Sequence, residues 1–513
     1  MIFQLFTSSG SASSKGRAYP KALAILLGAE IPELMGRFGI MATLVLYLTH
    51  VLSLSDTQAF AVYGTYLMMS FITPILGGFL ADRFLGYQRA VLLGAALMVL
   101  GNACLIIPDL FAIYCGLSIM AMGVGFFSPA LVALVNALYR DKEDGREQAF
   151  VLYYICRNVG ALIAPTVCGV IGLTVGYSYA FLFTAICMLI GLGIFMRGQR
   201  HLPQMTPSSS TSSQSFLVVA LNRFFSEKPY LSYGSLIFLS IILVVCAFMY
   251  SLSQIFLIAG GCAVLTIAVR LYQRADAQQR QGLHAILLSI AVMIVFFSIN
   301  QLCGASFNLF VDRLIHRSVM GFTLPTSVFF SINPLFMIIF GGFFMALINK
   351  IRRPNYVTAA FTKYALALGI FALAMFVLKL AAQQAHEHGM ASGFYIVVSY
   401  SLCALAELCM VPIVIALIGR LAPSGQVGLL MGIYQFGSAI ASYITTHIAN
   451  VAAINFPLTS AHALRHAAGI YQHVFGELAL VLIASAVLVC VMRTMVQRAY
   501  RQAIRVSPVL EGN

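Results

Sequence analysis

Residues 20–48 read PKALAILLGAEIPELMGRFGIMATLVLYL, a long apolar run with three ionisable residues in its middle. It is long enough to cross a bilayer, whose core of ~30 Å takes about 20 apolar residues in a helix. Glu30, Glu33 and Arg37 lie within it at offsets of zero, three and seven, so they share one helix face. Because charge is costly at this depth, a buried ionisable residue points to function. We therefore predict a membrane helix that carries a functional site.

The rest of the chain has the same character. It is 60% hydrophobic and 9% charged, whereas a soluble domain carries roughly 25% charged residues. In lipid each span must satisfy its own backbone, so runs of this length predict helices. The short alternating segments of a membrane barrel are absent. We expect an all-α membrane protein with fourteen spans, at residues 22–49, 57–81, 88–107, 110–139, 148–171, 176–196, 231–251, 255–273, 283–311, 324–348, 358–381, 392–419, 427–450 and 472–492.

The basic residues predict the orientation of these spans. Of the 30 Lys and Arg residues, 24 fall in loops or at span ends on one side, 4 in loops or at span ends on the other, and 2 deep inside spans. Loops rich in Lys and Arg stay in the cytoplasm, so both termini are predicted to be cytoplasmic. The net charge of +14 is then a topology signal, and we expect no nucleic-acid partner.

Other functional classes find little support in the sequence. The eleven cysteines lie singly, with no spacing typical of a metal site. The ten histidines are scattered, without an HExxH or HxxxD pattern. An enzyme, a metal and an organic cofactor are therefore not expected. The first residues, MIFQLFTSSGSASSKG, show no cleaved signal.

Several longer motifs follow one another along the chain. Residues 77–89 read GGFLADRFLGYQR, residues 125–139 GFFSPALVALVNALY and residues 150–165 FVLYYICRNVGALIAP. Residues 305–313 read ASFNLFVDR, residues 321–336 GFTLPTSVFFSINPLF and residues 405–423 LAELCMVPIVIALIGRLAP. With these motifs in order over nearly its whole length, the chain resembles the proton-dependent oligopeptide transporters (POT or PTR family) of the major facilitator superfamily, as an atypical bacterial member.

The resemblance implies a major facilitator fold of two six-helix bundles, with an inserted two-helix hairpin. The one low-complexity segment, around TPSSSTSSQS, is expected to be a cytoplasmic linker. The expected order is a cytoplasmic tail (1–21), the N-terminal bundle (22–198), the linker (199–230), the hairpin (231–274), the C-terminal bundle (282–493) and a cytoplasmic tail (494–513).

The resemblance also assigns roles, beginning in the first span. Glu30 and Glu33 match the two glutamates of the family's ExxER motif, which implies proton coupling. Burial favours the neutral acid and a nearby base favours the carboxylate, a balance that suits a group exchanging protons. A fixed ion pair that only holds two helices together is the alternative. The motif's arginine is Leu34 here, and Arg37 is the nearest residue that could bind a substrate carboxylate.

Three further positions depart from the family. The lysine of the fourth span is replaced by Ser128, and the glutamate of the ninth span by Gln301. Arg157 replaces an apolar residue beside Asn158. We expect Arg157 to restore the positive charge lost at Ser128, opposite Glu407; the alternative is that it reaches toward the membrane interface.

The remaining site residues follow the family pattern. Glu407 is expected to bind the amino group of a peptide, and Asn158 and Asn333 its backbone. Tyr66 and Tyr154 are expected to line the pocket, with Gln301 beside them. Asp82, Arg83 and Arg89 form the loop between the second and third spans and are expected to act as a conformational latch.

Together these expectations describe a proton-coupled importer of di- and tripeptides that works by alternating access, as a monomer, in a bacterial inner membrane. The proton would be the coupling ion, and the bilayer and a small peptide the partners. A different cargo, such as an anionic or amino-acid-like metabolite, remains open, as do export, and exchange or sensing of peptides without proton coupling.

Overall fold

The computed structural model describes residues 21–139, 143–202, 240–249, 252–319, 321–350, 356–423 and 426–506. Long helices running nearly parallel dominate it, which confirms the predicted all-α membrane class. Twelve helices are long and apolar enough to cross a membrane. Shorter apolar helices at Ser240–Met249 and Thr326–Gly341 occupy the positions of the other two expected spans. Most of the expected linker (203–230) and the start of the expected hairpin (231–239) lie outside the described residues.

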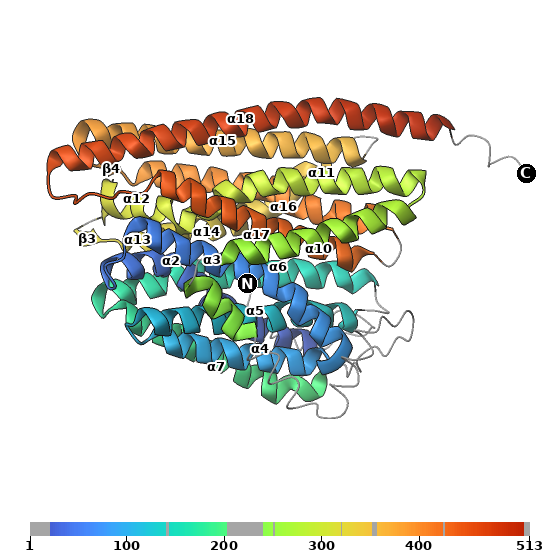
Figure 1. The fold of residues 1–513 in the computed structure, drawn as a ribbon, viewed down its shortest axis with the longest axis horizontal. Coiled ribbons are helices and arrows are strands. Elements are labelled where there is room, and N and C mark those ends of the chain that lie inside the picture. The colour runs from blue at the N-terminus through green and yellow to red at the C-terminus, as the bar shows by residue number, and fades with distance from the viewer. Residues whose placement is uncertain are drawn as a thin grey trace, which may run out of the picture.

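The first six spans occupy the lower half of Figure 1. They are α2 (Lys21–His50), α3 (Asp56–Leu80) with the π-helical turn η1 (Ala81–Leu85), α4 (Tyr87–Leu105), α5 (Leu110–Leu138), α6 (Glu143–Thr174) and α7 (Tyr177–Gly198) with the 3-10 turn η2 (Gln199–His201). The N-termini of two helices are capped by side chains. At α3, Ser55 forms a capping box with Gln58, and at α5 the carboxylate of Asp109 accepts a hydrogen bond from the backbone N–H of Ala112.

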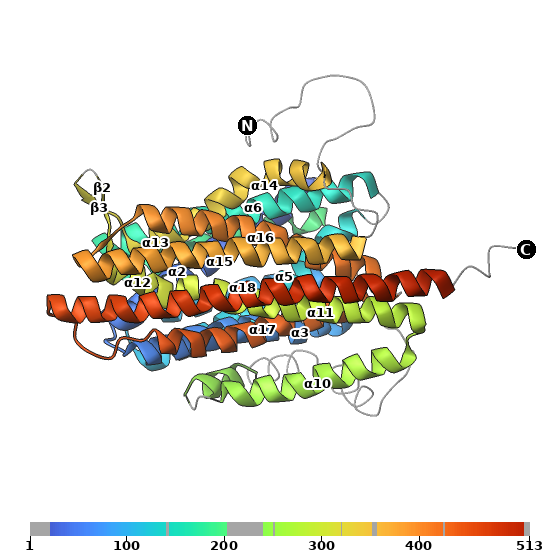
Figure 2. The same ribbon diagram turned by 90° about the horizontal axis from the view of Figure 1, so that it is seen from above.

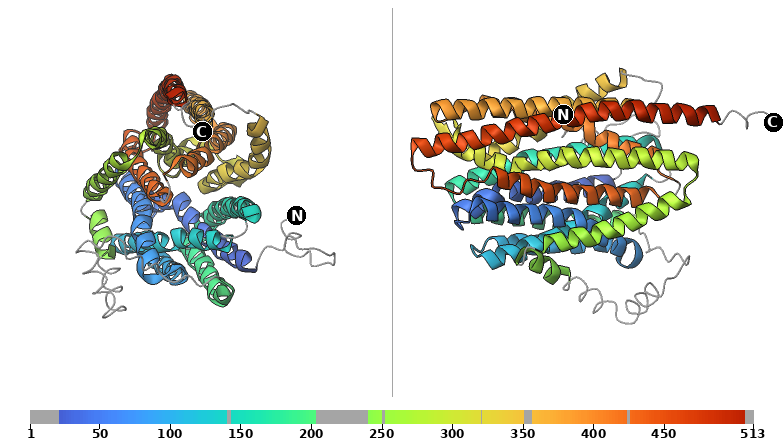
Figure 3. Two further views of the ribbon diagram at one scale, coloured as in Figure 1. Left: turned by 90° about the vertical axis from the view of Figure 1, so that its right-hand side faces the viewer. Right: turned by 45° about the horizontal axis from the view of Figure 1, so that its top comes forward.

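The last six spans occupy the upper half. They are α11 (Ala277–Asn300) continued by the 3-10 turn η3 (Gln301–Gly304) and α12 (Ser306–Leu314), α13 (Thr326–Phe330) continued by α14 (Ile332–Lys350), α15 (Tyr356–His388), α16 (Phe394–Leu421), α17 (Val427–Val451) and α18 (Ala461–Val506). The end-on view in Figure 3 shows the helices of both halves arranged around one axis.

The two ends of the molecule differ in charge. We call the end that carries Arg83, Arg200, Arg274 and Arg420 the basic end, and the other the opposite end. Four short strands lie at the opposite end (Figure 1). β1 (Ile315–His316) pairs in parallel with β4 (Ala391–Ser392), and β2 (Ser318–Val319) pairs antiparallel with β3 (Phe322–Thr323).

Glycines bring the helices close, as in other membrane bundles. A Cβ at Gly101 of α4 would lie 2.8 Å from the carbonyl of Gly116 of α5, and the reverse contact is also 2.8 Å. Gly64 of α3 faces Thr446 of α17 without room for a side chain, so these two helices join the halves of the molecule.

The hairpin helix α10 (Ser253–Arg274) stands apart from both halves, as Figure 2 shows. None of its residues is buried. Its closest approach is to α17, where Gly260 meets the ring of Phe436. The helix is therefore surrounded mainly by the membrane.

Candidate transport site

The helix α2 places three ionisable side chains inside the N-terminal half. Glu30 and Glu33 are 1% and 0% exposed. Arg37 lies one turn after Glu33, with its Nε 3.3 Å from Oε1 and its Nη2 donating to Oε2 over 3.4 Å. The shared helix face expected from the sequence is thus an ion pair between Glu33 and Arg37, with Glu30 one turn earlier.

Glu30 has two partners on α6. The hydroxyl of Tyr153 donates to its Oε1 over 2.7 Å, and Nη1 of Arg157 donates to the same oxygen over 3.1 Å. The guanidinium of Arg157 also donates to the Tyr153 hydroxyl over 3.2 Å and lies 5.7 Å from the centre of its ring. We call Glu30, Glu33, Arg37, Tyr153 and Arg157 the acid–base cluster.

Arg157 therefore pairs with Glu30, and no ion pair among the described residues joins it to Glu407, so its position opposite Glu407 stays a prediction. The reason for the pairing with Glu30 lies three residues further along α6. A Cβ at Gly160 would be 2.9 Å from Cβ of Leu34 and 3.0 Å from the carbonyl of Ile31, so α6 rests directly on α2. This contact holds the preceding turn of α6 beside Glu30. The guanidinium is still 33% exposed, which leaves it accessible to a solute.

Glu407 of α16 belongs to the other half and has amide partners only. Asn300, the last residue of α11, and Asn333 of α14 each donate to its Oε2 over 3.4 Å. No cationic side chain pairs with Glu407 in the part of the chain that the structure describes. Asn300 was not expected; it precedes Gln301, which the family pattern singled out.

Two tyrosines link the halves of the site. Tyr154 of α6 and Tyr434 of α17 both lie within electrostatic reach of Arg157 and Glu407. The Tyr154 hydroxyl points to the sulfur of Met337 on α14, 3.9 Å away. Its carbonyl accepts a hydrogen bond of 2.9 Å from Asn158. Tyr154, Asn158 and Asn333 thus lie where a solute bridging Arg157 and Glu407 would touch them.

Two other expected residues are more deeply buried. Tyr66 of α3 is 0% exposed. Gln301 is 9% exposed and begins the 3-10 turn that interrupts its span. Its carboxamide forms no hydrogen bond with any described residue. A buried polar group without a partner is uncommon and often marks a functional position.

Comparison with known proteins identifies the family of the chain. The POT family model matches residues 88–458, which is more than half of the chain. The chain belongs to the POT family. Dipeptide and tripeptide permease A of Pectobacterium carotovorum subsp. carotovorum (strain PC1) is 24% identical over 477 residues, covering 92% of this chain and 91% of the relative. The protein of the same name from Proteus mirabilis (strain HI4320) is 24% identical over 474 residues, covering 90% of this chain and 92% of the relative.

Solved structures of POT proteins share the fold. The peptide transporter POT in complex with sulfate has a TM-score of 0.80 at 22% identity, covering 97% of this chain and 99% of that one. A bacterial homologue of the human drug peptide transporters PepT1 and PepT2 has a TM-score of 0.75 at 23% identity, covering 94% of this chain and 98% of that one. The major facilitator architecture expected from the sequence is thereby confirmed.

The expected latch of this POT protein lies at the basic end. Asp82 and Arg83 belong to the π-helical turn η1, and Arg89 opens α4. Among the described residues, no ion pair involves Asp82, Arg83 or Arg89. Their role as a latch stays a prediction.

Ion pairs between the halves close the opposite end of this POT protein. Arg313 of α12 donates to both oxygens of Asp56, over 2.6 and 2.7 Å, and the backbone of Ile454 donates to Asp56 Oδ2 over 2.9 Å. His50, at the end of α2, lies 3.0 Å from Asp312. Sequence analysis missed these pairs, since Asp56 looks like a residue of the first turn of a helix and the partners are far apart in the chain.

Proposed function

We propose that this POT family protein imports di- and tripeptides together with protons. The observation that carries the proposal is the division of charge across the site. The acid–base cluster holds two carboxylates, each already paired with an arginine, whereas Glu407 is held by amides alone. The two ends of a peptide, a carboxylate and an ammonium, match these two sides. The names of the relatives, dipeptide and tripeptide permeases, support the same cargo.

Glu407 would bind the amino group of the peptide. A carboxylate with amide partners keeps lone pairs free for further donors, and an ammonium offers three. Asn333, which orients Glu407, and Asn158 on the other side would donate to the peptide backbone. Tyr66 and Tyr154 would complete the pocket, with Gln301 beyond it.

The carboxylate of the peptide would bind an arginine that becomes free when its glutamate partner takes up a proton. In the structure Arg37 is engaged by Glu33. When Glu33 takes up a proton, its negative charge disappears and the guanidinium becomes free to form a bidentate contact with the substrate. Protonation and peptide binding then favour the same state, which is the linkage that symport requires. Glu30 and Arg157 would act as the second such pair.

The same pairing disfavours an anionic metabolite as cargo. Both arginines of the cluster face a glutamate, so neither offers an uncompensated positive charge. The site as a whole carries three carboxylates and two guanidinium groups, which suits a solute with an amino group better than a dianion.

Transport would take place across a bacterial inner membrane, with both termini in the cytoplasm, as the distribution of Lys and Arg predicts. The proton would be the coupling ion, with no other cofactor and no enzymatic step. One chain should suffice, because a single chain supplies all residues of the site; a relative, PepTSo2, has been crystallised as a tetramer.

Uptake into liposomes tests the proposal. The purified protein is reconstituted, and a labelled dipeptide is followed with and without an inwardly directed proton gradient. Accumulation above equilibrium only with the gradient is the expected result. Exchange of peptide without accumulation would contradict the coupling, and no peptide flux at all would contradict the cargo.

A further inference from the structure

A cavity lies outside the transport site, at the basic end, between the hairpin helix α10 and the start of α17. Its volume is about 440 Å³. It is lined by Ile267, Arg270, Leu271, Arg274, Ala275, Gln279, Pro423, Gln426 and Leu429. The cavity exists because α10 touches α17 near its middle, where Gly260 meets Phe436, and has no buried residue along its length.

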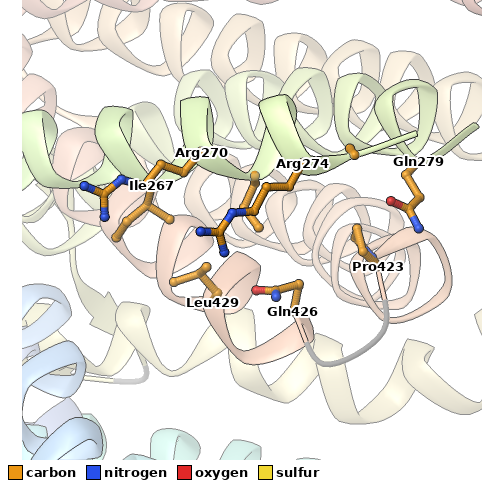
Figure 4. A pocket seen from close by; sticks show the side chains of 9 residues that line it. Ile267, Arg270, Arg274, Gln279, Pro423, Gln426 and Leu429 are labelled. Carbon is orange, nitrogen blue, oxygen red and sulfur yellow. The ribbon is translucent and has the colours of Figure 1, made fainter. Parts of the chain in front are cut away.

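The upper part of the cavity is cationic. Arg270 and Arg274 are four residues apart and project from one face of α10. Figure 4 shows both side chains leaving α10 on the side of Gln426 and Leu429. Both are exposed, and neither forms an ion pair with any residue that the structure describes. Two unpaired guanidinium groups at this spacing attract an anion.

The part of the cavity toward the middle of α10 is apolar. Ile267 lies one turn before Arg270 and Leu271, toward the middle of the helix, and Leu429 faces them from α17. A cationic side formed by two arginines, next to an apolar side formed by Ile267, Leu271 and Leu429, matches a phospholipid, whose phosphate is followed by acyl chains.

We propose that this cavity binds the headgroup of an anionic phospholipid, with Arg270 and Arg274 on the phosphate and an acyl chain along α10. Arginine suits phosphate because its planar fork donates two parallel hydrogen bonds. Gln279 and Gln426 would donate to the remaining oxygens. The lipid would fill the gap between α10 and α17 and so couple the hairpin to the C-terminal half. This proposal is independent of the transported cargo.

The chain contains no tryptophan, which allows a clean test. The variant Leu429→Trp places a single fluorophore in the cavity wall. It is reconstituted in vesicles that contain dibrominated phosphatidylglycerol or dibrominated phosphatidylcholine, whose bromines quench nearby tryptophan. Because a basic residue near a membrane surface contributes about 1 kcal/mol of attraction to anionic lipid, we expect a preference of roughly tenfold or more for phosphatidylglycerol.

Matched variants distinguish a specific lipid site from a general attraction of anionic lipid to basic residues. Arg270→Gln with Arg274→Gln should abolish the preference, and each single change should reduce it about fivefold. Arg197→Gln with Arg200→Gln removes the same charge from exposed positions at the basic end and should leave it intact. Leu189→Trp, 56% exposed on α7, should show little preference.

Three results would overturn the proposal. Equal quenching by both lipids at Leu429→Trp would deny any selectivity. If the preference for phosphatidylglycerol persisted after both Arg270 and Arg274 were changed, the lipid site would lie elsewhere in the protein. Relief of quenching by millimolar glycerol phosphate would show a site for soluble phosphates, in which no acyl chain takes part.

Discussion

At the scale of single residues, Glu33 differs from Glu30 in how firmly its charge is held. Glu30 accepts a short bond from Tyr153 and another from Arg157, whereas Glu33 has Arg37 alone, at 3.3 to 3.4 Å. Hydrogen bonds to the charged form stabilise it. Glu33 is therefore the carboxylate that gives up its charge more readily, and we assign it the coupled proton.

The variant Glu33→Gln tests this assignment. Glutamine keeps the shape but cannot exchange a proton, so gradient-driven accumulation of dipeptide should fall to equilibrium while exchange of peptide persists. Counterflow and gradient-driven uptake, measured on the same liposomes, distinguish the two. Glu477→Gln, an exposed glutamate outside the site, is the control and should transport normally. Undiminished accumulation in Glu33→Gln would refute the assignment.

Glu407 is the residue whose loss should change recognition. Among the described residues its hydrogen-bond partners are the amides of Asn300 and Asn333, so the change to glutamine leaves no cation there unpaired. Charged hydrogen bonds contribute about 1.5–3 kcal/mol, so KM for a dipeptide should rise by roughly tenfold or more.

N-acetylated dipeptides provide the control for Glu407→Gln. They lack the ammonium group, so the variant should take them up no worse than the unaltered protein does. If the variant discriminated against acetylation as strongly as before, Glu407 would not be the group that binds the amine.

At the scale of helices, most of the fold could be predicted because span length and apolar content are local properties. The interruptions within the helices could not be predicted. Residues 283–311 read as one continuous apolar helix, yet η3 interrupts it at Gln301–Gly304. The cause is tertiary: a side chain at Gly304 would overlap the Tyr63 hydroxyl and approach the carbonyl of Met41, on two other helices.

The acid–base cluster depends on the close contact between α2 and α6. Gly160→Ala should push the helices apart, since its Cβ would lie 2.9 Å from Leu34 Cβ and 3.0 Å from the Ile31 carbonyl. Overpacking of this kind costs about 1–3 kcal/mol. We expect a lower midpoint of thermal unfolding and slower peptide uptake, because Arg157 and Glu30 would separate.

The matched control is Gly369→Ala, in an exposed turn of α15 with no atom within 4 Å of the new Cβ. Alanine favours helix over glycine, so this change should leave the midpoint unchanged or raise it slightly. An unchanged midpoint and unchanged uptake in Gly160→Ala would mean that α2 and α6 can separate at no cost.

At the scale of the whole molecule, sequence alone supplied candidate residues and left their partners open. It placed Glu30, Arg157 and Glu407 in the membrane but did not join Arg157 to Glu30, because pairing depends on which faces of α2 and α6 meet. It also missed the bond between Asp56 and Arg313, residues 257 positions apart. Each looks like an ordinary charge at a helix end until the two halves are brought together.

That bond bears on alternating access, because it must break when the opposite end opens. Asp56 is 3% exposed and accepts two hydrogen bonds from Arg313 and one from Ile454, all across the halves. Arg313→Gln would leave a buried carboxylate without its cation, which typically costs about 3–5 kcal/mol. We expect faster hydrogen exchange in α12 and residues 451–461, and slower peptide uptake.

The double change Asp56→Asn with Arg313→Gln distinguishes two effects: the role of the ion pair in closing this end, and the penalty of burying an unpaired charge. It removes both charges, so the penalty disappears and amide hydrogen bonds can remain. Hydrogen exchange should fall back toward that of the unaltered protein, although the opposite end should still open more readily. If Arg313→Gln left exchange in α12 unchanged while α18 served as the internal reference, the pair would contribute nothing to closure. The halves would then be held together by the contact between Gly64 and Thr446 and similar packing, independent of charge.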